Sequence, residues 1–329
     1  MSPISPRVLM ARMLIALALP SIFGVVIFGL PALLNIVVSV AVAVGAEAGF
    51  RRLIKQESRI RDCSAAVTGL LLALIIPPST PLWMTALGAL FAIVVAKEFF
   101  GGLGANVFNP ALTGRAFMIM SFPAALTTWD QPVDFGAMVR DMIGATPLLT
   151  DVVSSATPLL TDAVSTATPL NIIRQGGILA DAGTSYGSII QTLFLGFRSG
   201  SIGETSIVLI IISGVFLLVT QTIDWRAPLS MICSAFLCSW ILGMDPVVGI
   251  LSGGLFFGAV FMATDYVSAP ITSPGKLLFG CGAGIITVLI RKWGAFPEGV
   301  TYSILIMNAV SPFFNRLTTR KYGFVPAKK

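Results

Sequence analysis

The chain has 329 residues, of which 55% are hydrophobic and only 11% are charged. Soluble domains carry roughly 25% charged residues, so this composition excludes a protein whose whole surface faces water. No histidine occurs, which excludes histidine-ligated haem, histidine-based zinc sites and histidine general bases. The four cysteines lack C-x-x-C spacing, so neither a metal site nor a disulfide framework is expected.

Long apolar runs predict an all-α polytopic membrane protein, because a helix needs roughly 20 apolar residues to cross a bilayer. In chain order, the predicted crossings lie near residues 11–29, 31–50, 63–78, 81–100, 111–128, 204–223, 226–244, 246–264, 276–292 and 297–316. We therefore expect about ten transmembrane helices. They divide the chain into a first five-helix unit at 1–128, a polar loop region at 129–203 and a second five-helix unit at 204–329.

The two halves resemble each other weakly: DCSAAVTGLLLA, which begins at Asp62, resembles DPVVGILSGGLFFGA, which begins at Asp245. Because each half has an odd number of predicted crossings, the two copies would insert in opposite senses as inverted repeats. Glycine and proline interrupt both halves, notably around 101–110 and 252–274. In lipid, such breaks are tolerated where protein or a cavity satisfies the backbone. Ordinary loop ends and packing glycines are the alternative interpretation.

Basic residues predict the orientation in the membrane, since cytoplasmic loops are enriched in lysine and arginine. They cluster after the second predicted crossing and at the C-terminus, at Arg51, Arg52, Lys55, Arg59, Arg61, Arg316, Arg320, Lys321, Lys328 and Lys329. Both termini are therefore expected in the cytoplasm, with the 129–203 region outside it. The net charge of +6 is read as this orientation signal and not as a sign of nucleic-acid binding.

Ionisable residues inside membrane helices are energetically expensive and are therefore candidates for function. They are Glu47, Lys97, Glu98, Arg115 and Asp265, with Asp62, Asp245 and Glu298 at the edges. Asn109, Arg115 and Asp265 lie in the most interrupted parts of the two halves, where a cofactor or ion cavity would be lined. For each charge, the alternative is a helix-end residue that snorkels or pairs with a neighbour.

The sequence predicts no catalytic residue of its own. The glycine-rich run GGLGANVFNP at 101–110 lacks the Lys-Ser/Thr of a P-loop, so the chain is not expected to bind NAD(H). Without histidine, a nucleophile would also lack its usual base.

The polar region contains a repeated Ala-Thr-Pro-Leu, in GATPLLTDVV at 144–153, SSATPLLTDAV at 154–164 and STATPL at 165–170. A residue that precedes proline is biased toward extended backbone, so each threonine hydroxyl would be accessible for modification. A hydroxyl in such a setting is an acceptor that something else must activate. From these residues alone, the alternative to a modification site is a low-complexity duplication in a loop whose copies have diverged.

Several runs in the chain resemble those of one known family. They are VTGLLLALIIPPSTPLW, AKEFFGGLGANVFNPALTGRAF, GSIGETS, LSGGLFFGAVFMATDYVSAPITSPGKLLFG and FPEGVTYSILIMNAVSPFFNR. They look like the D subunits of Rnf, the ion-translocating ferredoxin:NAD oxidoreductase, and are similar to the B subunits of the sodium-translocating NADH:quinone reductase. The resemblance implies an inverted five-plus-five helix repeat like that of urea transporters.

The resemblance further implies FMN attached through its phosphate to a threonine in a D-x-x-S/T-G-A-T motif, by a flavin transferase. Thr168 fits this motif, with Asp162, Ser165 and Ala167 at the matching offsets, and Thr157 fits it as the second choice. Both sites depart from the pattern at the glycine, where Thr166 or Ser155 stands. Thr168 is preferred because it lies nearer to the downstream GSIGETS run.

The same resemblance implies a non-covalent riboflavin in the membrane helices, Na⁺ or H⁺ as the translocated ion, and the other Rnf subunits as partners. A urea-transporter-like solute channel and a scaffold protein are the competing interpretations. A channel has no need of the threonine motif, and a scaffold has no need of broken helices in both halves.

The motif makes a direct prediction about Thr168. Because a phosphoester needs a hydroxyl, Thr168→Val should abolish the covalent flavin, seen as in-gel fluorescence of the denatured chain, while Thr157→Val should leave it intact. In Thr168→Val, attachment of FMN to the second site at Thr157 would hide the effect. Peptide mass mapping of the wild-type protein avoids this complication. An FMN-sized addition on the Thr157 peptide with Thr168 bare would show that the other copy is the anchor.

Overall fold

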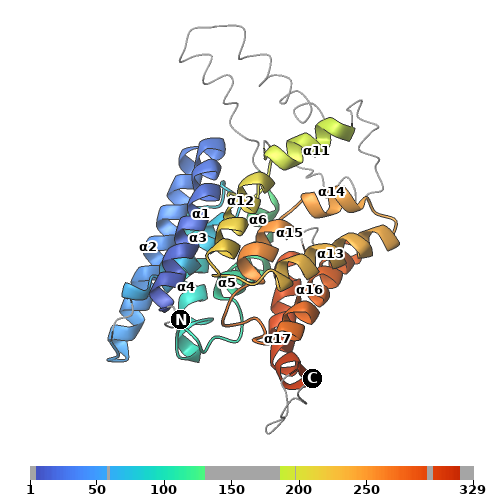
Figure 1. Ribbon diagram of the computed structural model, residues 1–329. Coiled ribbons are helices and arrows are strands. Elements are labelled where there is room, and N and C mark those ends of the chain that lie inside the picture. The colour runs from blue at the N-terminus through green and yellow to red at the C-terminus, as the bar shows by residue number, and fades with distance from the viewer. Residues whose placement is uncertain (1–4, 58–59, 130–185, 197, 295–298, 319–329) are drawn as a thin grey trace, which may run out of the picture.

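The computed structural model describes residues 5–57, 60–129, 186–196, 198–294 and 299–318, and these ranges contain helices and no strand (Figure 1). The predicted all-α class is therefore confirmed. The first half contains α1 (Pro6–Phe28), α2 (Leu30–Leu53), η1 (Ile60–Asp62), α3 (Ser64–Leu74), α4 (Leu82–Val94), η2 (Glu98–Phe100), α5 (Pro110–Ser121) and α6 (Pro123–Thr127). The second contains α11 (Tyr186–Leu195), α12 (Ile207–Val219), α13 (Arg226–Ile241), α14 (Pro246–Leu251), α15 (Leu255–Phe257), η4 (Gly258–Met262), α16 (Ser273–Trp293) and α17 (Val300–Thr318).

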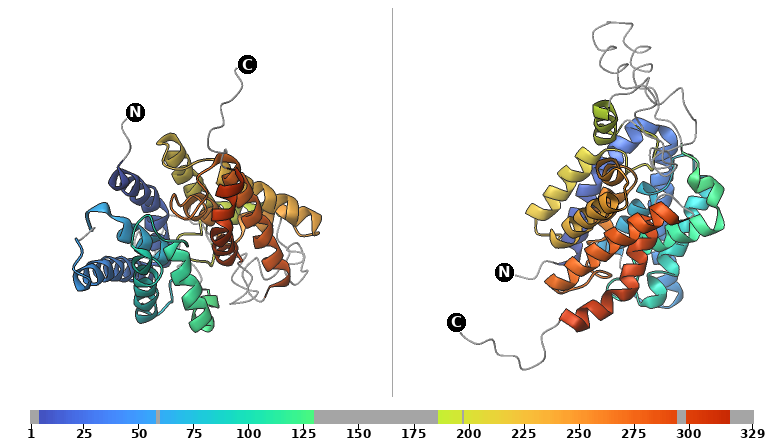
Figure 2. Two further views of the ribbon diagram at one scale, coloured as in Figure 1. Left: turned by 90° about the horizontal axis from the view of Figure 1, so that it is seen from below. Right: turned by 90° about the vertical axis from the view of Figure 1, so that its right-hand side faces the viewer.

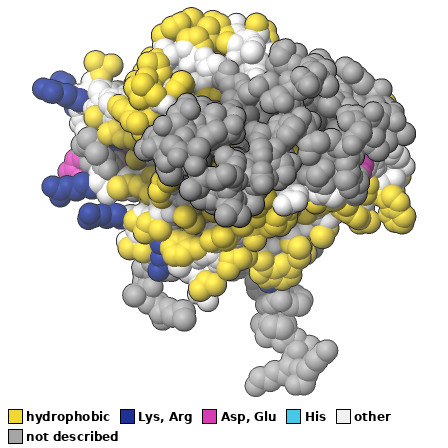
Figure 3. Space-filling view, turned by 90° about the horizontal axis from the view of Figure 1, so that it is seen from above, with side chains coloured by type: hydrophobic (Ala, Val, Ile, Leu, Met, Phe, Trp, Pro, Cys, Tyr) yellow, Lys and Arg dark blue, Asp and Glu magenta, His cyan; other side chains and the backbone are white. Residues whose placement is uncertain are grey.

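The helices have the length and the surface of a multi-pass membrane protein. Within the described ranges, four segments are long and apolar enough to cross a membrane, namely Pro6–Phe28, Leu30–Leu53, Leu82–Phe100 and Ser273–Trp293. α3, α12 and α13 are apolar but shorter. Large apolar side chains such as Ile22, Val37 and Trp240 are exposed. In the view from above, hydrophobic side chains cover much of the periphery of the molecule (Figure 3). The count of ten crossings stays a prediction.

Two of the predicted crossings are short or broken helices. α3 ends at Leu74, shortly before Pro77 and Pro78. The predicted crossing at 246–264 is divided into α14, α15 and the π-helix η4. The break falls where Ser252 is extended, with φ −91° and ψ 151°, and where Gly253 has φ 65°, a conformation that glycine adopts without steric cost.

The segment 198–203, which precedes α12, hydrogen-bonds the end of the short helix α3. Gly203 donates its backbone N–H to the carbonyl of Leu74 at 2.7 Å, and Ile202 donates to Ile76 at 3.2 Å. Arg198, on the same segment, donates to the carbonyl of Leu251 at the end of α14, at 3.1 Å. Arg291 of α16 donates to the carbonyl of Ser252 at 3.2 Å. The buried helix ends of both halves are thereby hydrogen-bonded.

The helices of the two halves pack in a similar order along the chain. α2 packs on α3 and α4, and α4 packs on α5; likewise α13 packs on α14 and α16, and α16 packs on α17. The halves lie beside each other in the view from below and meet where α1 packs on α12 and α5 on α17 (Figure 2). Close approach of α16 to α13 requires Gly280 and Gly284, since an added Cβ would collide with the carbonyls of Ala227 and Met231.

The ends of the described helices divide between two sides of the molecule. α1 begins and α17 ends on one side, whereas α11 lies on the opposite side (Figure 1).

Candidate functional site

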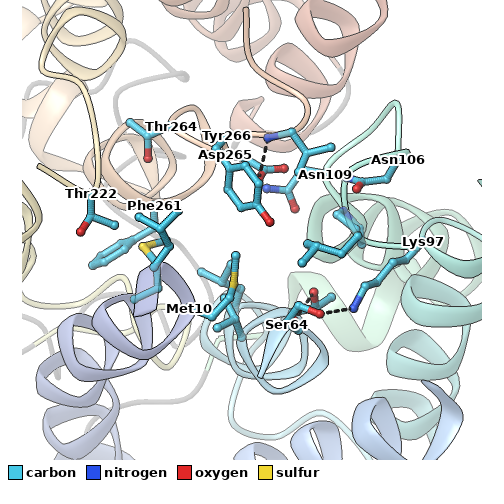
Figure 4. Close-up of a pocket in the computed structure, with 18 of the residues that line it drawn as sticks. Met10, Ser64, Lys97, Asn106, Asn109, Thr222, Phe261, Thr264, Asp265 and Tyr266 are labelled. Atoms are coloured by element: carbon cyan, nitrogen blue, oxygen red, sulfur yellow. Dashed lines mark hydrogen bonds between the residues drawn. The ribbon is translucent and has the colours of Figure 1, made fainter. Parts of the chain in front are cut away.

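A pocket with about 710 Å³ of empty space, part of it open to the surroundings, lies where the two halves meet (Figure 4). The first half contributes Leu9, Met10 and Met13 of α1, Ser64, Val67, Thr68 and Leu71 of α3, and Lys97, Leu103, Asn106, Asn109 and Pro110. The second half contributes Thr222, Ile223, Phe261, Thr264, Asp265, Tyr266 and Val267. An apolar lining with a few polar groups is typical of small-molecule sites.

Asn109 is positioned by its role as the N-cap of α5. Its Oδ1 accepts hydrogen bonds from the backbone N–H groups of Ala111 and Leu112, at 3.1 and 3.3 Å. Asparagine is favoured at this position because its side-chain oxygen satisfies free N–H groups of the first turn. The Nδ2 donor of Asn109 has no hydrogen-bond partner among the described residues.

Asn106 complements Asn109 on the same wall. Its Nδ2 donates to the carbonyl of Phe108 at 3.0 Å, which leaves the Oδ1 acceptor without a partner in the part of the chain that is described. The wall therefore presents one amide donor and one amide acceptor. Asn106 was not among the predicted site residues, although it lies only three positions before Asn109 in the same glycine-rich break.

Asp265 faces the pocket from the opposite half, beside Tyr266 and Thr264 (Figure 4). Its carboxylate accepts from the hydroxyl of Ser268 at 2.8 Å and from the backbone N–H of Val267 at 3.4 Å. These bonds fix the turn that follows η4. Thr264 and Tyr266 were missed in the sequence, because hydroxyl side chains in a loop carry no periodic signal.

Lys97 lines the pocket and belongs to a buried ionic network. Its ammonium donates to Ser64 Oγ at 2.6 Å and to Glu47 Oε1 at 3.2 Å. Arg51 pairs with Glu98 at 3.2 Å and lies 3.9 Å from Glu47. All four charged residues are at most 5% exposed. Buried charges persist when they are paired and hydrogen-bonded, so the pairing explains how these residues are tolerated here.

Arg115 lies in a different polar cluster. Its guanidinium is 3.6 Å from Glu204 and 3.2 Å from the hydroxyl of Thr301, and Arg115 does not line the pocket. Of the three predicted cavity residues, the structure brings Asn109 and Asp265 into one pocket and separates Arg115 from them. The predicted flavin-attachment residues Asp162, Ser165, Ala167 and Thr168, with Thr157, lie outside the described residues.

A second group of charges, which does not line the pocket, joins the turn between α12 and α13 to α16. Asp224 accepts from Arg226 at 2.9 Å and from Lys276 at 3.1 Å. Burial alone raises the pKa of the Asp224 carboxyl, but the hydrogen bonds from Arg226 and Lys276 outweigh it, and the pKa lies below the ordinary value. Asp224 therefore stays ionised at neutral pH and holds the two cations.

Across the described residues, no group of three or more Cys, Asp or Glu side chains could hold a metal ion.

Comparison with known proteins identifies similar chains over nearly the whole length. The model of the NQR2, RnfD, RnfE family matches residues 2–323. The D subunit of a proton-translocating ferredoxin:NAD(+) oxidoreductase complex from Clostridium ljungdahlii is 39% identical over 313 residues, which cover 92% of this chain and 87% of the relative. The D subunit of the Na(+)-translocating complex from Acetobacterium woodii is 37% identical, covering 92% and 86%. The D subunit of an ion-translocating oxidoreductase complex from Stutzerimonas stutzeri is 37% identical, covering 96% and 91%.

The ionic network predicts different costs for two adjacent arginines. Arg51 is buried and Arg52 is exposed. Because Arg51→Met would leave Glu98 as an unpaired buried charge, it should lower the free energy of unfolding by about 3–5 kcal/mol. Arg52→Met should change it by no more than about 0.5 kcal/mol. Denaturant unfolding of the detergent-solubilised protein measures both values, and equal stabilities of the two variants would contradict the importance of the network.

Proposed function

Since the chain belongs to the NQR2, RnfD, RnfE family, we propose that it is the D subunit of an Rnf-type ferredoxin:NAD oxidoreductase, which couples electron transfer to ion translocation. The observation that carries this function is the identity of 37–39% with D subunits over 92% of the chain. The enzyme is the whole complex, an oxidoreductase and translocase. This chain contributes a membrane unit for electron transfer and has no independent active site.

One flavin of this proposal is FMN bound covalently to Thr168, with Thr157 as the second choice. The Asp162, Ser165 and Ala167 offsets support it, as does the family membership of the chain. A flavin transferase would attach the FMN during maturation. The helix α11 (Tyr186–Leu195), which lies within the 129–203 region, is on the side opposite the beginning of α1, and this supports a location of the region away from the termini (Figure 1).

The second flavin is riboflavin, bound without a covalent bond in the pocket between the halves. The residues fit this group in two respects. Asn109 Nδ2 and Asn106 Oδ1 offer the donor and acceptor that the imide edge of an isoalloxazine requires. Met10, Ile223 and Phe261 offer an apolar wall for its dimethylbenzene end.

Riboflavin, when bound, supplies the ability to take up and pass on electrons, and the protein supplies position, hydrogen bonding and exclusion of water. Asn106 and Asn109 would hold the polar edge. The rigid N-cap of α5 keeps Asn109 in place, because its side-chain oxygen is committed to two backbone N–H groups. The methionine and phenylalanine side chains would keep water from the rings.

The membrane arrangement of this proposal is the ten-helix inverted repeat, with five-helix units at 1–128 and 204–329 and the flavin-bearing loop region at 129–203 outside the cytoplasm. The matching helix pairs and the breaks in both halves support the repeat. The basic residues support cytoplasmic termini in a bacterial or archaeal cytoplasmic membrane. The pocket, lined by the beginning of α1 and the residues just after α12, would then open toward the cytoplasm.

The partners are the other Rnf subunits, among them the second one that carries covalent FMN, and the translocated ion is Na⁺ or H⁺. The names of the relatives include both a proton-translocating and a Na(+)-translocating complex. The B subunit of the sodium-translocating NADH:quinone reductase is the alternative within the same family.

The orientation can be tested with a reporter enzyme that is active only in the cytoplasm. Because both termini are assigned to the cytoplasm, the reporter should be active when fused after Lys329 and inactive when fused after Asp181. The opposite pattern would exclude the proposed topology.

The riboflavin site can be tested with Asn109→Asp, which keeps an oxygen to cap α5 but removes the Nδ2 donor. Loss of a hydrogen bond worth about 1–3 kcal/mol should lower riboflavin affinity about 5- to 150-fold. The measurement is riboflavin released per mole of denatured complex, at a fixed riboflavin concentration. Asn315→Asp is the matched control, because Asn315 also accepts a backbone hydrogen bond, from Ile271, but does not line the pocket.

Two results would count against this site. If the wild-type complex releases no riboflavin, the membrane flavin is wrong. If Asn109→Asp retains as much riboflavin as Asn315→Asp, the flavin binds without Asn109.

A further inference from the structure

We infer that Lys97 is the residue that sets the reduction potential of the flavin in the pocket, and that Glu47 moderates its effect. The inference rests on the proposed riboflavin site and adds to it an electrostatic role for two named residues. Lys97 is 1% exposed and is among the largest fully buried side chains of the described residues. A lysine so deeply buried is rare unless it is paired.

The ammonium group of Lys97 is held at the edge of the pocket by fixed partners (Figure 4). It donates to Ser64 Oγ at 2.6 Å and to Glu47 Oε1 at 3.2 Å. An ammonium has three N–H donors, so one donor has no partner among the described residues. Lys97 and Ser64 both line the pocket, whereas Glu47 does not. The positive end of the ion pair therefore lies nearer to the pocket than the negative end.

One other charged residue lines the pocket. Among the described residues that line the pocket, Lys97 is the only cation and Asp265 is the only anion. Asp265 belongs to the opposite half, where Ser268 and Val267 already hydrogen-bond its carboxylate. Behind Lys97, Arg51 and Glu98 pair with each other at 3.2 Å, which leaves Glu47 as the anion that balances Lys97.

Electron transfer into the pocket changes its charge. A flavin bound in the pocket would gain one negative charge when a one-electron donor of the complex reduces it, with no bond formed or broken. Charges interact strongly away from water, and the nearer of two opposite charges dominates. Lys97 therefore stabilises the reduced flavin, and Glu47 opposes it from a greater distance.

This arrangement predicts shifts of opposite sign for two substitutions. Lys97→Met removes the cation and should lower the midpoint potential. Glu47→Gln removes the anion but keeps an oxygen that can accept from Lys97, so it should raise the midpoint potential. General loosening of the pocket would shift both variants in the same direction. Lys97→Arg retains the charge and should restore most of the wild-type potential.

The experiment uses the full chain, produced without a flavin transferase, purified in detergent and loaded with riboflavin. Quenching of riboflavin fluorescence gives the affinity, and spectroelectrochemical titration gives the midpoint potential of the bound flavin. We expect each shift to reach at least a tenfold change in the reduction equilibrium, which is ~59 mV for a one-electron couple. Lys276→Met is the matched control, since this cation pairs with Asp224 and does not line the pocket.

The outcomes distinguish failure of the proposed riboflavin site from failure of the role assigned to Lys97. A wild-type chain that binds no riboflavin would overturn the proposed site. A chain that binds riboflavin, but whose potential is unchanged or shifts in the same direction in Lys97→Met and Glu47→Gln, would overturn the role of Lys97 alone. If Lys97→Met does not fold, the upward shift in Glu47→Gln, set against Lys276→Met, decides the question.

Discussion

Helix ends that lie in apolar surroundings must find hydrogen-bond partners within the protein, and this constraint organises the molecule. α3 ends among fully buried residues. The N–H of Gly203 bonds the carbonyl of Leu74, its last residue, and the N–H of Ile202 bonds that of Ile76 just beyond. α14 ends in the same way against Arg198 and Arg291. The segment around Arg198 therefore ties the two halves together. Without such partners, neither half could contain a broken helix.

The breaks in turn create the polar pocket. Where α5 begins, Asn109 is committed to capping, so its amide donor is fixed in direction. Where η4 ends, Asp265 turns the chain by accepting from its own neighbours. Side chains that stabilise local structure thus also line the space between the halves.

Buried charge is the second feature that the fold has to accommodate. Glu47, Arg51, Lys97 and Glu98 balance one another, which makes their burial tolerable. Glu47 keeps one oxygen, Oε2, buried without a hydrogen-bond partner among the described residues. The network is therefore not arranged for stability alone. Because Lys97 of this network lines the pocket, the charges of the network act on any molecule that binds there.

The sequence by itself determined the membrane class, the helical content and the positions of most helices, because apolar runs of sufficient length have few other stable states. It also singled out Asn109 and Asp265, since breaks in apolar helices mark places where backbone and side chains need partners. Family resemblance supplied the flavin chemistry, and the attachment motif at Thr168 depends on it.

Only the tertiary structure decided which of these residues meet. Arg115 was grouped with Asn109 and Asp265 in the sequence but pairs with Glu204, which belongs to a distant segment. Asn106, Thr264 and Tyr266 joined the pocket without any sequence signal strong enough to select them. The physical reason is that burial and ion pairing depend on contacts between helices far apart in the chain, and a local pattern carries no information about which helix a given face will contact.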